Sequence, residues 1–345
     1  IVGYIDLHCD VLLHFLLSDD FDLFSSKRSS VDLDRLYRAG AMAQCFAIYQ
    51  PSADELKAKR ISESEYIDYI ICKFNKTLSD HNDIVAPAVS AQEIMKNHQL
   101  GILSAILALE DGRSVNSEFD KLIAYRNLGI RMLTLTWYQE NCFGSPSSDV
   151  SSIMSSGLSQ FGRESVALMN ELGIIIDVSH LSDGGFWDLI ELSDKPIIAS
   201  HSNCRELVPH FRNLSDEMIR ALSEKGGVMG LNFCHFFLAD VRETGSIGGS
   251  VVNEILFQHK KTNWYSRVKD MVRHVHHAYD IGGENVLAIG TDFDGIPTEN
   301  LEIDSPLKME LLFTALRESG LPGSAIDKMM FKNALRVFAD TDTIV

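Results

Sequence analysis

Short apolar runs separated by longer amphipathic segments recur along the whole chain. Eight runs have the length and the Val, Ile and Leu content of buried β-strands, at residues 3–10, 41–49, 103–110, 131–137, 174–180, 196–201, 227–233 and 286–292. Helical patterns lie between them, at 31–39, 52–79, 120–128, 163–172, 184–192, 216–225 and 265–279, and a last one at 307–319 follows the eighth run. Strands that alternate with helices predict parallel βα units, and eight such units close into a (β/α)8 TIM barrel, an α/β fold.

The length of the chain is compatible with one such barrel. It has 345 residues, and no internal repeat, low-complexity tract or Pro/Gly linker divides it, so we predict a single barrel domain over residues 1–345. Two longer insertions, 143–161 and 235–264, follow the predicted fourth and seventh strands. As βα loops they would overhang the active face of the barrel.

Composition narrows the class of protein. Hydrophobic residues make up 45% of the chain and charged residues 23%, as in ordinary globular proteins. The net charge of −17 opposes binding to nucleic acid or to an anionic membrane, so we expect neither as a partner. Six cysteines without a C-x-x-C pair indicate free buried thiols. No leader or membrane span stands out, and we expect a cytoplasmic protein; because the chain begins at Ile1 and not at Met, residues before it are left open.

Five of the predicted strands end on side chains that commonly bind metals. These side chains are His8 with Asp10, then Glu110, His180, His201 and Asp292. Alternation along a strand places His8 and Asp10 on one face. A single histidine at a strand end is usually satisfied by local hydrogen bonds, but carboxylates and imidazoles gathered in one barrel mouth need a cation or another partner to neutralise them. The set therefore predicts a metal centre.

The number of ligands favours two ions. The three histidines, Asp10 and Glu110 exceed what one open tetrahedral zinc ion takes. Glu110 is the natural bridge, because its two oxygens can hold two cations; the alternative is a loop residue paired with Arg113. A hydroxide shared by two such cations is a strong nucleophile at neutral pH. Asp292 is placed to shuttle its proton, whereas Asp294, which precedes a glycine, fits a turn better.

Six segments resemble the renal (membrane) dipeptidase family in order and spacing over nearly the whole chain. They are Asp6-x-His8-x-Asp10, Leu109-Glu110-Asp111-Gly112, Asp177-Val178-Ser179-His180, Ser200-His201-Ser202, Arg212-Asn213-Leu214-Ser215-Asp216 and Gly290-Thr291-Asp292-Phe293-Asp294-Gly295. The resemblance implies a binuclear zinc dipeptidase on a metallo-dependent hydrolase barrel. It also implies dipeptide substrates, in many members with a D-residue tolerated at the C-terminal position.

The resemblance further assigns roles to single residues. The implied metal ligands are His8 and Asp10 at one Zn2+ ion, His180 and His201 at the other, and Glu110 between them. Asp292 would be the acid/base, Arg212 would bind the substrate carboxylate, and Asn232 would line the substrate site. A planar guanidinium can grip a carboxylate with two parallel hydrogen bonds, although on sequence alone Arg212 could instead cap the helix near Asp216. Buried asparagines often only satisfy backbone groups.

One position departs from the family. Members of the renal type have a histidine after Leu-Thr-Leu-Thr, where it helps to hold the scissile carbonyl, and this chain has Trp137. An indole donates one hydrogen bond but cannot become a cation, so oxyanion stabilisation would depend more on the zinc ions. We predict that Trp137 contacts the substrate and alters the substrate range. His210, His235 and Tyr138 are alternative stand-ins for the histidine, and the sequence does not separate them.

A zinc dipeptidase is thus the leading hypothesis. One alternative is an amidohydrolase that acts on another small amide, ester or lactam and needs no carboxylate clamp. Another is a non-catalytic metal-binding barrel, against which Asp292 counts, because a structural site needs no spare acid. A homodimer is left open. His274, His276 and His277 precede the eighth strand on a helix far from the strand ends, so there we expect packing or solvated side chains and not a further metal site.

Overall fold

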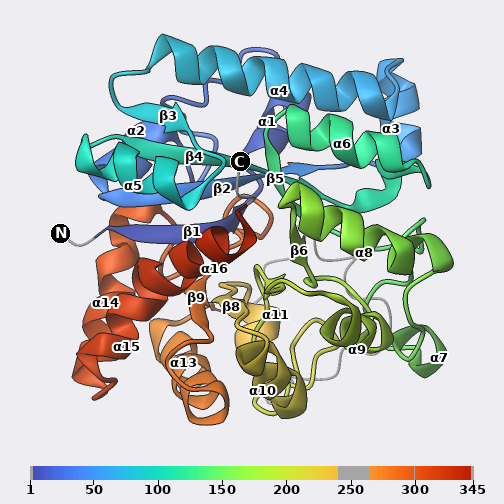
Figure 1. Cartoon of the computed structure of the whole chain (residues 1–345). Coiled ribbons are helices and arrows are strands. Elements are labelled where there is room, and N and C mark those ends of the chain that lie inside the picture. The colour runs from blue at the N-terminus through green and yellow to red at the C-terminus, as the bar shows by residue number, and fades with distance from the viewer. Residues whose placement is uncertain (1–2, 240–264, 299, 343–345) are drawn as a thin grey trace.

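Eight parallel strands close into a barrel in the computed structural model, which describes residues 3–239, 265–298 and 300–342 (Figure 1). The strands are β1 (Tyr4–Cys9), β2 (Ala41–Tyr49), β3 (Val85–Pro87), β4 (Leu103–Glu110), β5 (Ile130–Thr134), β6 (Ile175–Asp177), β7 (Ile198–Ala199), β8 (Val228–Leu231) and β9 (Leu287–Ile289). The ring runs β1–β2–β4–β5–β6–β7–β8–β9 and returns to β1, all in parallel. The predicted TIM barrel and its eight strands are confirmed.

β3 lies outside this ring and pairs with β4 alone. The sequence does not predict it, because of its three residues only Val85 is buried and no apolar run marks it. Apolar length is the signal from which the other strands are predicted.

Helices cover the outside of the barrel (Figure 1). They are α1 (His14–Leu17), α2 (Leu33–Arg38), α3 (Ala53–Lys59), α4 (Glu63–Asp80), α5 (Ala91–Gln99), α6 (Phe119–Asn127), α7 (Ser151–Met154), α8 (Gln160–Leu172), α9 (Asp183–Leu192), α10 (Asp216–Glu224), α11 (His235–Leu238), α13 (Val268–Gly282), α14 (Met309–Glu318), α15 (Gly323–Asp327) and α16 (Asn333–Thr341). The second predicted insertion, 235–264, lies mostly outside the described residues, and only α11 and Ala239 at its start are described.

The single helix predicted over 52–79 is wrong, because the chain forms α3 and α4 there. Arg60 adopts a left-handed φ of 58°, which ends α3. Ser62 and Glu65 then form a capping box that starts α4, with each side chain accepting from the other's backbone N–H. The Ser-x-x-Glu spacing is a start signal that is visible in the sequence.

The C-terminal helix α16 closes the end of the barrel at which the strands begin. Its buried Val337 and Phe338 belong to the same apolar cluster as inward-pointing strand residues such as Ile5. Arg131, fully buried near the start of β5, donates to the carbonyl of Phe338 and to the carboxylate of Asp342 at 2.8 Å. With this end plugged, chemistry is confined to the opposite mouth, where the strands end.

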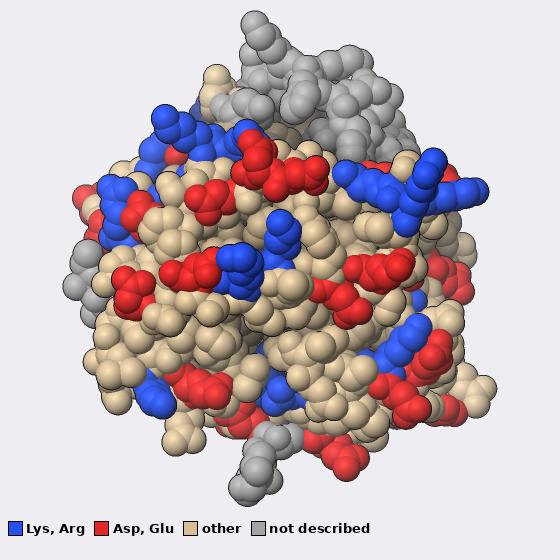
Figure 2. Space-filling model, turned by 90° about the horizontal axis from the view of Figure 1, so that it is seen from above, with Lys and Arg blue, Asp and Glu red and all other residues tan. Residues whose placement is uncertain are grey.

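Neither the charges on the surface nor the cysteines indicate a particular function. On the face shown in Figure 2, acidic and basic side chains are interspersed. Among the described helices, none has the length and apolarity needed to cross a bilayer. All six cysteines are free, as predicted; four are buried, whereas Cys142 is partly exposed and Cys72 is exposed.

Candidate metal centre

The six strand-end side chains meet at the mouth of the barrel. Each comes from the end of a different strand, apart from the pair on the first one. His8 lies in β1 and Asp10 directly after it, Glu110 ends β4, and His180, His201 and Asp292 follow β6, β7 and β9. All are buried except His180, which is partly exposed. Their common position follows from the parallel ring, which brings the carboxyl ends of all strands to one side.

One oxygen of Glu110 lies at the centre of this cluster. Its Oε1 is 3.3 Å from Nε2 of His180 and 3.7 Å from Nε2 of both His8 and His201. The Nε2 atoms of His180 and His201 are 3.0 Å apart. The alternative partner of Glu110 is engaged elsewhere, since Arg113 pairs with Asp111 and Glu63.

Asp10 and Asp292 complete the cluster on the other side of His8. Nε2 of His8 is 3.2 Å from Oδ2 of Asp10 and 3.9 Å from Oδ1 of Asp292. A Cβ atom at Gly295 would lie 2.1 Å from the Asp10 oxygen and 2.5 Å from the Asp292 oxygen, so a side chain there would displace both. The other oxygen of Asp10 is buried without a hydrogen-bond partner, which is a position that a cation satisfies.

The charges of the cluster also fit cations. Burial, followed by the charge of Asp10, raises the pKa of Glu110. Burial lowers the pKa of His180 and of His201, which keeps both imidazoles in the neutral form that binds metals. Burial also acts to lower the pKa of His8, but Asp10 and Glu110 outweigh it and raise this pKa to about 10. The carboxylates thus draw positive charge into the cluster, and the mixture of nitrogen and oxygen donors suits zinc.

Two of these residues adopt strained backbone conformations. His180 and Asp292 have φ values of 68° and 62°, in the left-handed region that residues other than glycine seldom adopt. Such strain persists where the surrounding structure imposes it, commonly at functional sites. At His180 the first predicted insertion supplies part of that support, since Ser147 N donates to the His180 carbonyl at 2.7 Å.

Asn232, just after β8, holds Asp292. Its Nδ2 donates to Oδ2 of Asp292 at 2.9 Å and to the carbonyl of His201 at 3.2 Å, and its Oδ1 accepts from Cys234 N at 2.7 Å. These contacts use both N–H groups of the amide inside the protein, and a substrate contact of Asn232 stays a prediction. Burial raises the pKa of Asp292 to about 7, against the lowering effect of His8.

Asp294 has a different environment, as predicted for a turn residue. Its carboxylate accepts from the backbone N–H groups of Ser30 at 2.7 Å and of Val31 at 3.0 Å. Its Oδ1 is also 3.4 Å from Nε2 of His14, so it ties the loop after β9 to the segment after β1.

Arg212 reaches the mouth from the loop between β7 and α10, and its side chain is buried. Nη2 donates to the carbonyl of His201 at 3.3 Å, Nη1 lies 3.5 Å from Oγ of Ser202, and Nε has no partner. Asp216, the alternative partner, is paired with His277 at 2.6 Å. A buried guanidinium with long or missing hydrogen bonds has donors to offer to an anionic ligand.

Trp137 lies at the same mouth, three residues beyond the end of β5, and is partly exposed. Its ring centroid is 6.2 Å from that of His180 and 4.9 Å from that of Tyr49, which it meets edge to face. Tyr49 ends β2 beside Glu110 and is absent from the candidates selected on sequence. Its position at the end of a predicted strand could have indicated a place at the mouth, but tyrosine is not a common metal ligand and so does not stand out in a search for ligands.

Two of the alternative stand-ins for the family histidine are histidines, His210 and His235, and neither is a cation at neutral pH. Burial lowers the pKa of His210 to about 3 and that of His235 to about 4. Nδ1 of His210 also accepts from the backbone N–H of Arg212 at 3.1 Å. Tyr138 is 39% exposed at the rim.

The three histidines of α13 pack as predicted. His274 is buried between Cys204 N and the carbonyl of Leu238. His276 contacts Ser319 at 2.7 Å and His277 pairs with Asp216, so each has a partner that is not a metal.

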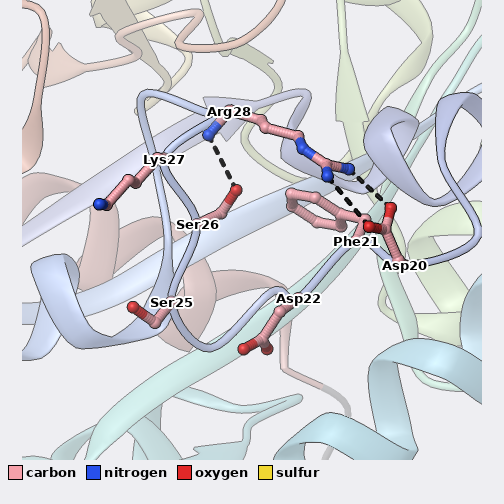
Figure 3. A pocket seen from close by; sticks show the side chains of 7 residues that line it. All are labelled: Asp20, Phe21, Asp22, Ser25, Ser26, Lys27 and Arg28. Atoms are coloured by element: carbon pink, nitrogen blue, oxygen red, sulfur yellow. Dashed lines mark hydrogen bonds and ion pairs between the residues drawn. The ribbon is translucent and has the colours of Figure 1, made fainter.

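A separate hollow of about 300 Å3 lies in the loop after β1 (Figure 3). Its charged lining includes Arg28, whose guanidinium holds Asp20 with contacts of 2.7 and 3.0 Å. None of the residues that line it is a candidate ligand, so the hollow is not part of the metal centre.

Comparison with known proteins agrees with this geometry. The family model described as membrane dipeptidase (peptidase family M19) matches residues 2–345. An uncharacterized protein in the pqqA 5′ region of Klebsiella pneumoniae is 31% identical over 253 residues, which cover 72% of this chain and 86% of that protein. Dipeptidase tcpJ of Claviceps purpurea is 25% identical over 96% of this chain and 73% of its own length.

A solved structure has the same fold over almost its full length. It is a metallo peptidase from Rhodobacter sphaeroides, liganded with a phosphinate mimic of the dipeptide L-Ala-D-Ala. The TM-score is 0.82 at 25% sequence identity, with 99% of each chain covered. The segments that carry the sequence resemblance therefore lie within one shared architecture.

Proposed function

The chain belongs to the membrane dipeptidase family (peptidase family M19) and is a hydrolase that acts on dipeptides, and from this premise we propose that it cleaves them at a centre of two zinc ions. The proposed ligands are His8 and Asp10 for one ion, His180 and His201 for the other, and Glu110 for both. The observation that carries the proposal is the approach of three imidazole Nε2 atoms to within 3.7 Å of a single Glu110 oxygen.

In this proposal the protein side chains transfer the proton and bind the substrate. Two zinc ions, when bound, supply an activated water and polarise the scissile carbonyl. Asp292, held by Asn232 and with a pKa raised to about 7 by burial, is suited to accept a proton and pass it to the leaving amine. Arg212 would bind the C-terminal carboxylate of the dipeptide, for which its incompletely bonded guanidinium is available.

Dipeptides with either an L- or a D-residue at the C-terminus are the proposed substrates. The bound mimic of the Rhodobacter sphaeroides relative supports the second class. The alternative hydrolysis of another small amide, ester or lactam would leave Arg212 without a role. The single domain over residues 1–345, the cytoplasmic location and the homodimer stay predictions.

Metal content tests the proposed centre directly. Purified protein supplemented with zinc is expected to hold close to two zinc ions per chain by elemental analysis, and a chelator should abolish cleavage of L-Ala-L-Ala and L-Ala-D-Ala. His8→Ala combined with Asp10→Ala should empty one position only, because the other ligands come from different strands. A protein that holds one ion or none after supplementation would contradict the bridged centre.

Trp137→His should change the substrate profile. The ring stands 6.2 Å from His180 at the mouth, so the substitution alters a group near the substrate and leaves the proposed ligands in place. We expect altered relative kcat/KM values across a panel of L,L and L,D dipeptides, with zinc content unchanged. Trp187→His, at an exposed position of α9, serves as the matched control. An identical profile in Trp137→His and wild type would mean that the indole does not contact the substrate.

A further inference from the structure

A buried carboxylate lies behind the proposed ligand His201. Asp177, the last residue of β6, is fully buried. Its Oδ1 accepts from the backbone N–H groups of Ser179 at 3.0 Å and of Ser200 at 2.8 Å. Its Oδ2 accepts from the hydroxyls of Thr134 at 2.7 Å and of Ser200 at 2.5 Å. Ser200 is thus anchored to Asp177 twice.

The Ser200 hydroxyl also touches the ring of His201. Its Oγ is 2.7 Å from Nδ1 of that ring, and the hydroxyl has one hydrogen to donate. The competing acceptor, Oγ of Ser179, is 3.3 Å away, whereas the carboxylate of Asp177 is closer and charged and so makes the stronger bond. With its hydrogen given to Asp177, Ser200 can only accept from His201, and Nδ1 must carry the ring hydrogen.

We propose that Asp177 and Ser200 are positioning residues that fix His201 in the Nδ1–H tautomer, so that the Nε2 lone pair is directed at a zinc ion. This inference rests on the proposed two-zinc centre and assigns one of its ligands a supporting pair of residues. Partners of this kind commonly set the tautomer and orientation of metal-binding histidines.

The neighbouring ligand supports the assignment. The His180 side chain is hydrogen-bonded by the backbone of Trp137, while its Nε2 lies 3.0 Å from Nε2 of His201. That short contact has two explanations, a hydrogen bond from one Nε2–H or two lone pairs that share cations. The proton arrangement at Ser200 excludes His201 as the donor, so the Nε2 lone pair of His201 is available either to Nε2–H of His180 or to a cation.

The position of Ser200 is set by close backbone packing. A Cβ atom at Gly230 would lie 1.9 Å from the Ser200 carbonyl oxygen, and one at Gly290 would lie 1.7 Å from it. The backbone at Gly230 in β8 and at Gly290 just after β9 therefore packs directly on the Ser200 backbone, which limits how far its hydroxyl can move from Asp177 and from the ring.

Two variants separate the contributions. Ser200→Ala removes the acceptor for Nδ1–H. In Asp177→Asn the amide oxygen must face the two backbone N–H donors, so Nδ2 faces Ser200 and donates to it, which frees the serine hydrogen for Nδ1. We therefore expect a loss of tautomer preference in Ser200→Ala and a shift towards Nε2–H in Asp177→Asn. The double variant should resemble Ser200→Ala.

Asp6→Asn is the matched control. Asp6 is also buried, and it lies two residues before the ligand His8, much as Asp177 lies three residues before His180. Its carboxylate accepts from two backbone N–H groups and from the Thr291 hydroxyl. No hydroxyl between Asp6 and a histidine ring is present in these contacts. The control therefore carries the same loss of a buried charge without the connection to an imidazole.

The experiment reads the ring directly by 15N NMR of metal-free protein at neutral pH, with the His201 signals identified by their loss in His201→Gln. Wild type and Asp6→Asn should show Nδ1–H at His201. In chelator competition, zinc affinity at one of two positions should fall by about ten- to a hundredfold in Ser200→Ala and Asp177→Asn. Nε2–H in wild type, or full zinc affinity in both variants, would overturn the proposal. Nδ1–H in a wild type that takes up no zinc would support the tautomer assignment and overturn the two-zinc function on which its purpose rests.

Discussion

Replacement of Asp292 by asparagine is expected to lower kcat for dipeptides by about two to four orders of magnitude, the contribution of a positioned acid/base. The asparagine keeps the size of the side chain and can still accept from Asn232, which now donates to Oδ2 of Asp292 at 2.9 Å. What the variant loses is the ability to take up and release a proton. Steady-state kinetics on a zinc-loaded sample, with zinc content measured in parallel, provides the comparison.

The parallel measurement is needed because Asp292 is also close enough to bind a metal. Together with His8 and Asp10 it offers three ligand atoms that lie within 4.8 Å of one another. If Asp292 is mainly a ligand, Asp292→Asn should lose about one zinc ion per chain, whereas an acid/base role leaves both ions in place. Asp294→Asn is the matched control, because that carboxylate binds the backbone of Ser30 and Val31 and should affect turnover little.

The barrel could be predicted from the sequence because its strands are buried on both faces and therefore appear as continuous apolar runs. β3 and the break between α3 and α4 could not be predicted from those runs. β3 gains its place by pairing with β4, and the break depends on the left-handed backbone of Arg60. Local apolar pattern does not record either kind of constraint.

The proposed ligands could be predicted because parallel strands place their carboxyl ends together, so residues far apart in sequence share one mouth. The hydrogen bonds around them were beyond the sequence. The sequence does not reveal that Asn232 donates to Asp292. The link from Asp177 through Ser200 to His201 requires β6 and β7 to be neighbours. Such contacts require distances that are correct to within tenths of an ångström, and the spacing of residues along the chain does not specify distances so closely.

Arg212→Met is expected to lower kcat/KM for dipeptides by roughly a hundredfold or more. The side chain is buried, its Nε has no partner, and its remaining bonds are 3.3 and 3.5 Å long, so its donors are available to a substrate carboxylate. Removing them would leave that carboxylate desolvated and unpaired, at a cost of about 2–4 kcal/mol, where each tenfold loss in rate corresponds to about 1.4 kcal/mol. Methionine keeps much of the volume and apolar stem, which limits the disturbance of packing.

Dipeptide amides decide whether the lost rate reflects the carboxylate clamp. They lack the C-terminal charge, so wild type should cleave them poorly and Arg212→Met should change their kcat/KM little. Arg205→Met is the matched control on the same loop, because the Arg205 guanidinium is already engaged by both oxygens of Asp183 at 2.6 and 2.8 Å and is not available to a substrate. It should retain the preference for free dipeptides over amides. If wild type instead cleaves amides as readily as free dipeptides, Arg212 does not act as a clamp, and hydrolysis of a broader range of small amides becomes the better account of this centre.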